Sequence, residues 1–482
     1  MPGLRATRPR SVGIVAVQVL ALAVVGSLGA SGRVRTAREI ATDPPGGALN
    51  PVTHNEPTVA IDPLSSSHLV ALYQQDRWTE EKVEGWPSRR TIGVATSRDG
   101  GRRWTSGSLP ALTTVTGGPF ERATDSVVTF GPDGAVYALT LAYDRVRGCR
   151  SAITVQRSDD GGGSFGVPSL VQDATACPLL GGAFVNDKGW ITADTFARSP
   201  HSGRLYVVWT REDLSTVSTP IVLRFSDDRA VTWSDTVTVS STSLLAGGFA
   251  PVPLVQPNGD LTVVYFDFHP ESAKPHVVAQ TSHDGGLAFD APVEIADDQS
   301  LEVPGIRSGR LIGAAIDPVR GDLYVVWQDG RLRDDGRNDI VLSRSTDGGA
   351  HWAEPRRVNG DALKERNHFT PAVAAYDGVV VVTFTTRDGD APWLQTRATV
   401  SPDGGTTFGN ARRLGPRGDV RFAQMDILLT QLPTLGDYTG LASDADGAHA
   451  VWIRPGRPRG HGRAPHQTPW TARIDTARPY RP

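Results

Sequence analysis

A short pattern, Ser-x-Asp-Gly-Gly-x-x-Trp or Phe, recurs six times along the chain and constrains its fold more than any other feature. The third copy is degenerate, because Arg229 and Ala230 replace its glycines. The aspartates of the six copies are Asp99, Asp160, Asp228, Asp284, Asp347 and Asp403, and the steps between them are 61, 68, 56, 63 and 56 residues. A near-constant period of this length indicates a repeat architecture built from one supersecondary unit.

Each copy has the chemistry of a tight β-hairpin turn. An Asp carboxylate accepts hydrogen bonds from backbone N–H groups of the turn, and the glycines supply positive φ angles. Between the copies lie paired apolar runs that are typical of buried strands, at residues 58–74, 126–142, 191–210, 251–266, 312–328, 371–385 and 438–453. Because the period fits a four-stranded antiparallel blade, the sequence predicts an all-β propeller.

The number of hairpins favours seven blades. There are seven apolar hairpins but six copies of the turn pattern, and a further strand-like stretch follows at residues 470–474. A strand near residues 34–40 would complete that last blade. Closing the ring with strands from both ends of the chain would leave no free sheet edge, which also favours a monomer. Six blades with an extra terminal hairpin is the alternative.

The N-terminal residues 1–31 are typical of an export signal. Arg5, Arg8 and Arg10 precede an apolar run at residues 12–28, and small residues follow. We therefore expect a secreted or extracellular protein in which residues 32–482 form a single propeller domain. An uncleaved segment would instead tether it to a membrane as an N-terminal anchor.

The only two cysteines are Cys149 and Cys177. In an oxidising compartment a lone pair usually forms a disulfide, and we place both on loops of the same propeller face. The alternative is two unpaired buried thiols.

Several function classes find no support in the sequence. The net charge of −3 favours neither nucleic acid nor an anionic membrane surface as a partner. There is no phosphate loop, dinucleotide fingerprint or nucleophile-elbow motif, and the histidines lack metal-ligand spacing. We therefore expect no cofactor, and a structural Ca²⁺ has no ordered loop pattern to support it.

The sixfold pattern resembles the Asp-box, or bacterial neuraminidase repeat, of the sialidase superfamily. The resemblance covers nearly the whole chain after residue 31. It implies a propeller in which the six aspartates are structural and lie on the rim, away from the ligand. It also implies a glycan or glycoconjugate partner and an exo-α-sialidase-like activity. Known sialidase catalytic domains have six blades, so a count of seven departs from the family.

Segments that enter the inner strands converge on the axis of a propeller, where ligands usually bind. Most of these segments are polar, and we expect a polar funnel at one end of the axis. By resemblance to sialidases, Tyr438 would be the nucleophile with Glu56 beside it, and Asp125, Asp187 or Asp76 the acid/base. The candidate substrate-binding residues are Arg122, Arg307 and Arg310, with Lys188 or Arg331 as substitutes, and Asp437. Salt bridges between blades are the structural alternative.

The sialidase resemblance is incomplete at the site. The Arg-Ile-Pro signature is missing, and Glu56 and Pro57 stand where it is expected. Two functions therefore compete: an exported glycoside hydrolase acting on sialylated or other glycans, and a non-catalytic propeller that binds glycans or proteins at the cell surface. A metal-dependent lyase or esterase is a weaker third alternative. The fold does not choose among them.

Overall fold

The chain folds into antiparallel β-sheets. The computed structural model describes residues 32–41, 52–77, 90–144, 150–175, 184–213, 216–269, 271–272, 274–360, 365–425, 430–457 and 466–476. Within these ranges the helical elements are two three-residue 3-10 turns, η1 (Thr114–Thr116) and η2 (Val420–Phe422). No helix in the described part of the chain is long and apolar enough to cross a membrane. The predicted signal segment 1–31 and both cysteines lie outside the described residues.

Six sets of four strands follow one another along the chain, each paired antiparallel in chain order. The sets are β3 (Val52–Asp62), β4 (Ser65–Arg77), β5 (Arg90–Ser97) and β6 (Thr105–Ser108); β7 (Arg122–Phe130), β8 (Val136–Tyr143), β9 (Arg150–Ser158) and β10 (Ser169–Thr175); β11 (Phe184–Ala193), β12 (Leu205–Asp213), β13 (Ile221–Ser226) and β14 (Val237–Thr238); β15 (Gly247–Val255), β16 (Leu261–Phe268), β17 (His276–Ser282) and β18 (Val293–Asp297); β19 (Gly313–Ile316), β20 (Leu323–Asp329), β21 (Asp339–Ser345) and β22 (Arg356–Arg357); and β23 (Arg366–Tyr376), β24 (Val379–Asp388), β25 (Trp393–Ser401) and β26 (Arg412–Arg413).

The last strands of the chain form a further antiparallel set, and strands from the N-terminal region pair with it. This set is β30 (Gly440–Asp444), β31 (Gly447–Pro455) and β32 (Gln467–Asp475), and β1 (Arg33–Val34) and β2 (Arg38–Glu39) pair antiparallel with β32. Two short elements, β28 (Gln424–Met425) and β29 (Pro433–Thr434), pair with each other, and β27 (Gly418–Asp419) pairs with β25.

Buried amides join the C-terminal strand to the first long strand. The Gln467 side chain donates to the His54 carbonyl at 2.9 Å and to the Asn55 side chain, and it accepts from the Gln424 backbone N–H at 2.9 Å. The side-chain amide oxygen of Gln424 in turn accepts from the Asn55 side-chain amide at 3.0 Å and from the Thr53 hydroxyl at 3.1 Å. All five side chains are buried. We call this group of hydrogen-bonded residues the amide clasp.

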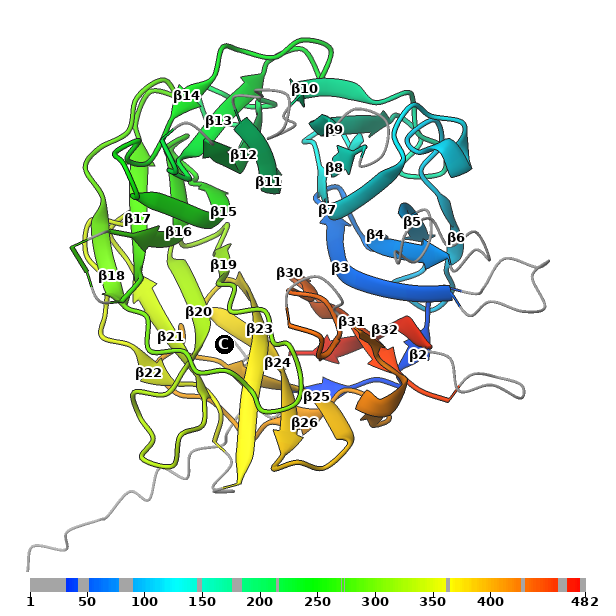
Figure 1. The fold of residues 1–482 in the computed structure, drawn as a ribbon, viewed down its shortest axis with the longest axis vertical. Coiled ribbons are helices and arrows are strands. Elements are labelled where there is room, and N and C mark those ends of the chain that lie inside the picture. The colour runs from blue at the N-terminus through cyan, green and yellow to red at the C-terminus, as the bar shows by residue number, and fades with distance from the viewer. Residues whose placement is uncertain are drawn as a thin grey trace, which may run out of the picture.

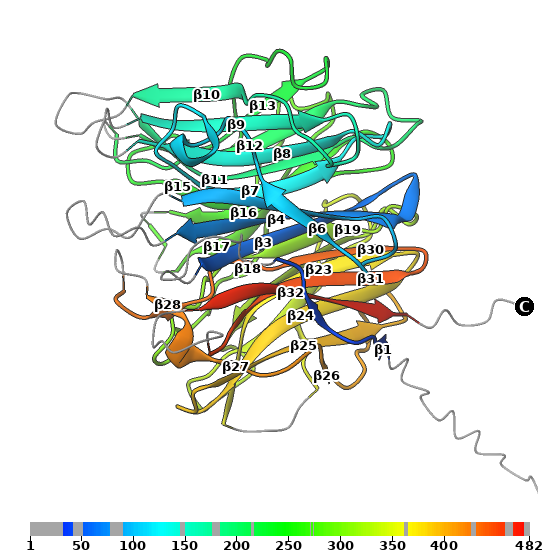
Figure 2. The same cartoon turned by 90° about the vertical axis from the view of Figure 1, so that its right-hand side faces the viewer.

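The sets stand side by side around a common axis, as Figure 1 shows, with β3, β7, β11, β15, β19, β23 and β30 innermost. Seen edge-on in Figure 2, β28 lies on one face of this arrangement, and β1 lies on the opposite face. The second strands are buried along almost their whole length because they pack between neighbouring sets. In β12 and β20, for example, Trp209 and Trp327 are fully buried in apolar clusters that each join two sets.

Five of the inner strands carry a β-bulge at the same place. In β3, β7, β15 and β23 two residues oppose one on the neighbouring strand, and in β11 a single extra residue, Lys188, is inserted. A bulge of this kind re-aims a side chain relative to the regular alternation of the strand. The first residue of each bulge has a positive φ, at Glu56, Asp125, Lys188, Ala250 and Thr370.

The six repeated turns share one hydrogen-bond pattern. In the second copy the Asp160 carboxylate accepts from the backbone N–H groups of Gly163 and Ser164, both at 2.9 Å, and from the Ser158 hydroxyl at 2.7 Å. The Ser164 hydroxyl, which donates to Asp160 at 2.7 Å, contributes most to holding the pKa of Asp160 far below its usual value, and the bonds above add to it. In the degenerate third copy, Arg229 and Ala230 adopt φ angles of 63° and 67°, so the turn persists without glycine.

Replacing Asp160 by alanine should destabilise the protein by about 1–3 kcal/mol, because it leaves turn N–H groups without their acceptor. Asp160→Asn keeps one carbonyl acceptor and should lose less. Urea unfolding of the two variants checks the order. An alanine variant as stable as the wild type would contradict the structural role of this carboxylate.

Candidate functional site at the inner-strand bulges

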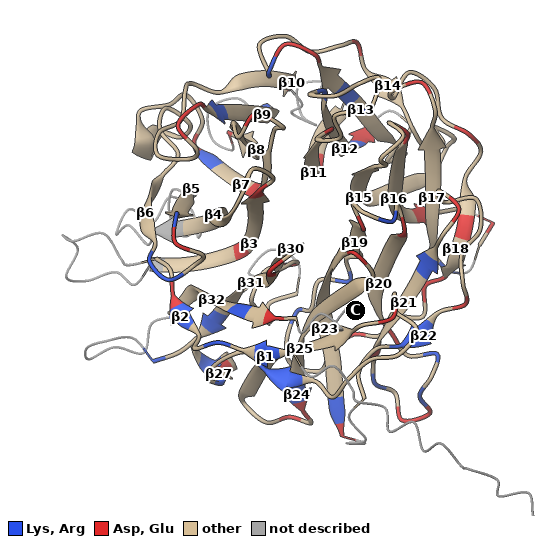
Figure 3. Cartoon of the chain, turned by 180° about the vertical axis from the view of Figure 1, so that it is seen from behind, with Lys and Arg blue, Asp and Glu red and all other residues tan. Residues whose placement is uncertain are grey.

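Three charged residues stand at the bulges of the inner strands in consecutive sets. They are Glu56 on β3, Asp125 on β7 and Lys188 on β11, with φ angles of 52°, 50° and 30°. An L residue rarely adopts a positive φ, and such strain often accompanies a functional site. Acidic positions on the inner strands β3 and β7 are visible near the centre in Figure 3.

Two loop segments complete the group from the other side of the ring. The backbone N–H of Arg307, in the segment before β19, donates to the Pro433 carbonyl at 2.8 Å. The Arg307 guanidinium then pairs with both oxygens of Asp437, at 2.7 Å each. Gly309 packs so closely on Asp437 that a Cβ there would lie 2.5 Å from the Asp437 Cα. The Arg307–Asp437 pair is therefore fixed by the backbone on both sides.

Lys188 occupies the middle of the group. Its Nζ lies 3.7 Å from the centroid of the Tyr438 ring, 4.9 Å from that of Trp190, and 3.8 Å from Asp125 Oδ1. Lys188 is only 4% exposed and Glu56 8%. Among the described residues neither Lys188 Nζ nor Glu56 Oε2 has a hydrogen-bond partner. Two buried polar atoms are thus left available at the axis.

The pKa values of the group are displaced by burial and by the crowding of carboxyls. Burial raises the pKa of Glu56 to about 8, and the Asp125 and Asp437 carboxylates add to the effect. Burial likewise raises the pKa of Asp187 to about 7, helped by Asp125 and Glu212. At neutral pH Glu56 therefore carries a proton, and a protonated carboxylic acid can serve as a general acid.

Burial also displaces the pKa values of Lys188 and Tyr438. Burial lowers the pKa of Lys188, although the surrounding carboxylates oppose this change. Burial raises the pKa of Tyr438 well above its usual value, and the Glu56, Asp125 and Asp437 carboxylates raise it further. The Tyr438 hydroxyl lies 3.5 Å from the Ser126 carbonyl. This environment opposes formation of a tyrosinate.

The group of Glu56, Asp125, Asp187, Lys188, Arg307, Asp437 and Tyr438, which we call the axial cluster, contains most of the residues expected from the sequence. Arg310 instead is exposed and lies 3.5 Å from Glu302. Arg331 pairs with Asp329 at 2.9 Å and Asp297 at 3.3 Å. Arg122 is partly exposed at the start of β7. The side chain of Asp76 lies outside the described part of the structure.

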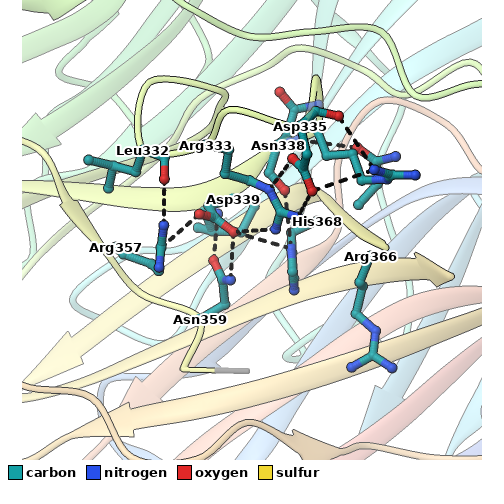
Figure 4. Close-up of polar contacts among 12 residues, drawn as sticks. Leu332, Arg333, Asp335, Asn338, Asp339, Arg357, Asn359, Arg366 and His368 are labelled. Carbon is teal, nitrogen blue, oxygen red and sulfur yellow. Dashed lines mark hydrogen bonds and ion pairs between the residues drawn. The ribbon is translucent and has the colours of Figure 1, made fainter. Parts of the chain in front are cut away.

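The loop that carries Arg331 is held by a buried polar network, shown in Figure 4. Asp339, at the start of β21, pairs with Arg333 at 3.1 Å, with Arg357 at 2.7 Å and with the Asn359 amide at 2.9 Å. Arg333 also pairs with Asp335. Because every carboxylate in this network faces a donor, it is best explained as structural support for the face of the ring that it occupies.

Two open grooves lie elsewhere, beside the Asp-box turns. One, of about 660 Å³, is lined by residues that include Arg98, Asp99 and Phe165, and the other, of about 460 Å³, by residues that include His283 and Asp347. Neither groove is lined by a charged residue with a positive φ angle or by a buried acid whose pKa is raised. The axial cluster, which has both, is the stronger candidate for chemistry.

Trp190 and the bulges themselves were not anticipated from the sequence. A signal was present, because Glu56, Ala250 and Thr370 each precede a proline inside a strand-like run, at Pro57, Pro251 and Pro371. Proline within a strand is confined largely to edges and bulges. No group of three or more His, Cys, Asp or Glu side chains in the described ranges is arranged to hold a metal ion.

Comparisons with known proteins bear on the family. Residues 88–309 match the model of the BNR repeat-like domain. No curated protein sequence matches the chain. Among solved structures, one of a protein of unknown function from Dyadobacter fermentans DSM 18053 is similar with a TM-score of 0.49 and 14% identity, over 93% of this chain and 100% of that one.

Two similar structures are of named enzymes. The Penicillium chrysogenum α-L-arabinanase, complexed with arabinobiose, has a TM-score of 0.48 and 15% identity, over 73% of this chain and 94% of that one. The Trypanosoma rangeli sialidase, complexed with 2,3-difluorosialic acid, has a TM-score of 0.43 and 15% identity, over 72% of this chain and 53% of that one. Neither likeness assigns a role to a residue of this chain. The match over residues 88–309 and the Asp-box turns show that the chain contains a BNR repeat-like domain.

Proposed function

We propose that this protein is an exported glycoside hydrolase that acts on sialylated or other glycans at the axial cluster. The observation that carries the proposal is Glu56, a buried carboxylic acid with a pKa raised to about 8, beside the partly exposed carboxylates of Asp125 and Asp437. A protonated acid next to an ionised carboxylate is the pair that most glycoside hydrolases use. The apolar segment within residues 1–31 supports export.

The architecture that we propose is a seven-bladed propeller closed by strands from both ends of the chain. Its support is the six sets of four strands together with β30, β31 and β32, to which β1 and β2 pair. The amide clasp between Gln467 and the first long strand also favours closure. Closure would fix the inner strands relative to one another, which pre-organises the charged bulges.

We assign the roles as follows. Glu56 protonates the leaving oxygen as general acid, and Asp125 acts on the opposite side of the sugar as base or nucleophile. The raised pKa of Tyr438 opposes its use as a nucleophile, so its ring instead supports the Lys188 ammonium at 3.7 Å. Asp187 is a second acid, with a pKa raised to about 7.

A non-catalytic glycan-binding propeller is the second candidate. It is favoured by the pairing of Arg307 with Asp437, which occupies a cation that a sialidase-like clamp would present to its substrate. In that case the carboxyls of the axial cluster would only accept hydrogen bonds from sugar hydroxyls.

The test is hydrolysis of a panel of fluorogenic glycosides, sialosides included, by the chain lacking residues 1–31. We expect turnover of at least one glycoside, with an activity that declines as pH rises through about 8, because Glu56 then loses its proton. A folded protein that hydrolyses no glycoside but binds glycans would establish the second candidate instead.

Tyr438→Phe separates the two assignments of the nucleophile. We expect this variant to keep turnover within about tenfold of the wild type, because the phenyl ring still supports Lys188. Asp125→Asn is the matched comparison, and it should lose at least a thousandfold in kcat. Loss of turnover in Tyr438→Phe as large as that in Asp125→Asn would return the nucleophile role to Tyr438.

A further inference from the structure

Resting on the proposed action of the axial cluster on sialylated or other glycans, we infer the narrower class: its ligand is an uncharged glycan, and sialylated and other carboxylate-bearing sugars are excluded. The pairing of the cations and the surplus of carboxyls around them carry this inference.

The cations near the axis are already committed to carboxylates. Arg307 donates from Nη2 to Asp437 Oδ2 at 2.7 Å, and its Nη1 forms an ion pair with Oδ1 at 2.7 Å, so the guanidinium already faces both oxygens of a carboxylate. Lys188 faces Asp125 at 3.8 Å and is otherwise covered by the rings of Tyr438 and Trp190. Arg122 is also engaged within the protein and is not free. A sugar carboxylate would have to displace one of these internal partners.

The cations farther from the axis are paired as well. Arg331 lies between Asp329 and Asp297, and Arg310 faces Glu302. None of these guanidinium groups stands free to clamp an anion. Each arginine assigned to the expected clamp therefore interacts within the protein, and Lys188, whose Nζ lacks a hydrogen-bond partner among the described residues, faces Asp125.

The charges of the axial cluster also disfavour a ligand that bears a carboxylate. Four carboxyls, Glu56, Asp125, Asp187 and Asp437, act on the Lys188 ammonium, whereas Lys188 and Arg307 are the cations that act on Glu56. An additional carboxylate would enter beside like charges in a poorly solvated place, which is costly. It would be repelled most strongly by Asp125 and Asp437.

Uncharged sugars meet none of these obstacles. Their hydroxyl groups donate hydrogen bonds, and carboxylate oxygens are acceptors only. The partly exposed Asp125, Asp187 and Asp437 can therefore accept from sugar hydroxyls while Arg307 and Lys188 remain in place. Trp190, partly buried beside Lys188, adds an aromatic surface next to the same acceptors.

The experiment is an array on which each acidic glycan is printed beside its carboxyl-reduced counterpart, probed with the chain lacking residues 1–31. The paired probes include sialyllactose and oligogalacturonate with their reduced forms. We expect the reduced member of any bound pair to bind at least tenfold more tightly. Equal or tighter binding of the acidic member would overturn the inference and leave the glycan-binding role intact.

A variant that is expected to gain affinity for acidic glycans provides a second test. Asp437→Asn releases the Arg307 guanidinium and removes one negative charge, so binding of the acidic members should rise at least tenfold. Glu354→Gln removes the same charge from an exposed position beside an Asp-box turn and should change neither member. An unchanged preference in a folded Asp437→Asn protein would count against the inference.

Two other outcomes are decisive. Selective binding of glucosamine glycans over their N-acetylated forms would overturn the inference by assigning a cationic ligand. Failure to bind any glycan, acidic, neutral or cationic, would overturn the proposed function itself, and this inference with it.

Discussion

Replacing Glu56 by glutamine should make the protein more stable at alkaline pH and at the same time abolish its proposed catalysis. The folded-state pKa of Glu56 is about 8, above its ordinary value of 4.5. The folded state therefore holds this proton more tightly than the unfolded state. Wild-type stability should fall as pH rises from about 4.5, and the loss should be complete above about 8.

Glutamine has the shape of the protonated acid and cannot ionise. The Glu56→Gln variant should therefore match the wild type near pH 4 and exceed its unfolding free energy by up to about 5 kcal/mol at pH 9. Melting temperatures of both proteins between pH 4 and 9 test this divergence. Glu354→Gln is the control, and its difference from the wild type should be small at every pH. Parallel curves for Glu56→Gln would show that Glu56 ionises as freely as an exposed acid.

Removing the side chain of Gln467 should be the most destabilising single change at the junction between the chain ends. Gln467→Ala leaves the Gln424 backbone N–H, the His54 carbonyl and the Asn55 amide oxygen without partners in a buried place. Each such group costs about 1–3 kcal/mol when unsatisfied, so we expect a loss of at least about 3 kcal/mol. The loss should also reach the axial cluster, because Asn55 adjoins Glu56.

Urea unfolding of Gln467→Ala measures this loss, with Gln172→Ala as the matched control. The Gln172 amide makes one exposed hydrogen bond, to the Asp173 carbonyl at 2.8 Å, and its removal should cost less than about 1 kcal/mol. A shift of the Glu56-dependent pH profile in Gln467→Ala would show that the clasp positions the cluster. Equal midpoints for the two alanine variants would contradict a stabilising role for the clasp.

The repeat was readable from the sequence because its physics is local. A serine, an aspartate and two positive-φ residues within five positions determine each Asp-box turn, and even the degenerate copy at Asp228 keeps the pattern. The all-β fold followed from that repeat. The convergence of inner-strand entries near the axis followed from the same reasoning, and it led to Glu56, Asp125 and Lys188 as candidates.

The charge states and the ion pairs of the axial cluster could not be predicted from the sequence. They depend on contacts between residues far apart in the chain, such as Arg307 with Asp437 and Lys188 with the ring of Tyr438. A lone arginine in a sequence gives no indication of whether a carboxylate already occupies it. The bulges that aim Glu56 and Asp125 also depend on strand register, which a hydrophobic pattern specifies only by face.

The pairing of β1 and β2 with β32 has a consequence during protein synthesis. Arg35 and Asp475, which form an ion pair, are separated by 440 positions. At roughly 5–20 residues per second, the first strands leave the ribosome about 20–90 seconds before their partner is made. During that interval the nascent chain presents an unpaired strand edge. A premature stop codon before residue 467 should therefore yield an aggregating product, however complete the other sheets are.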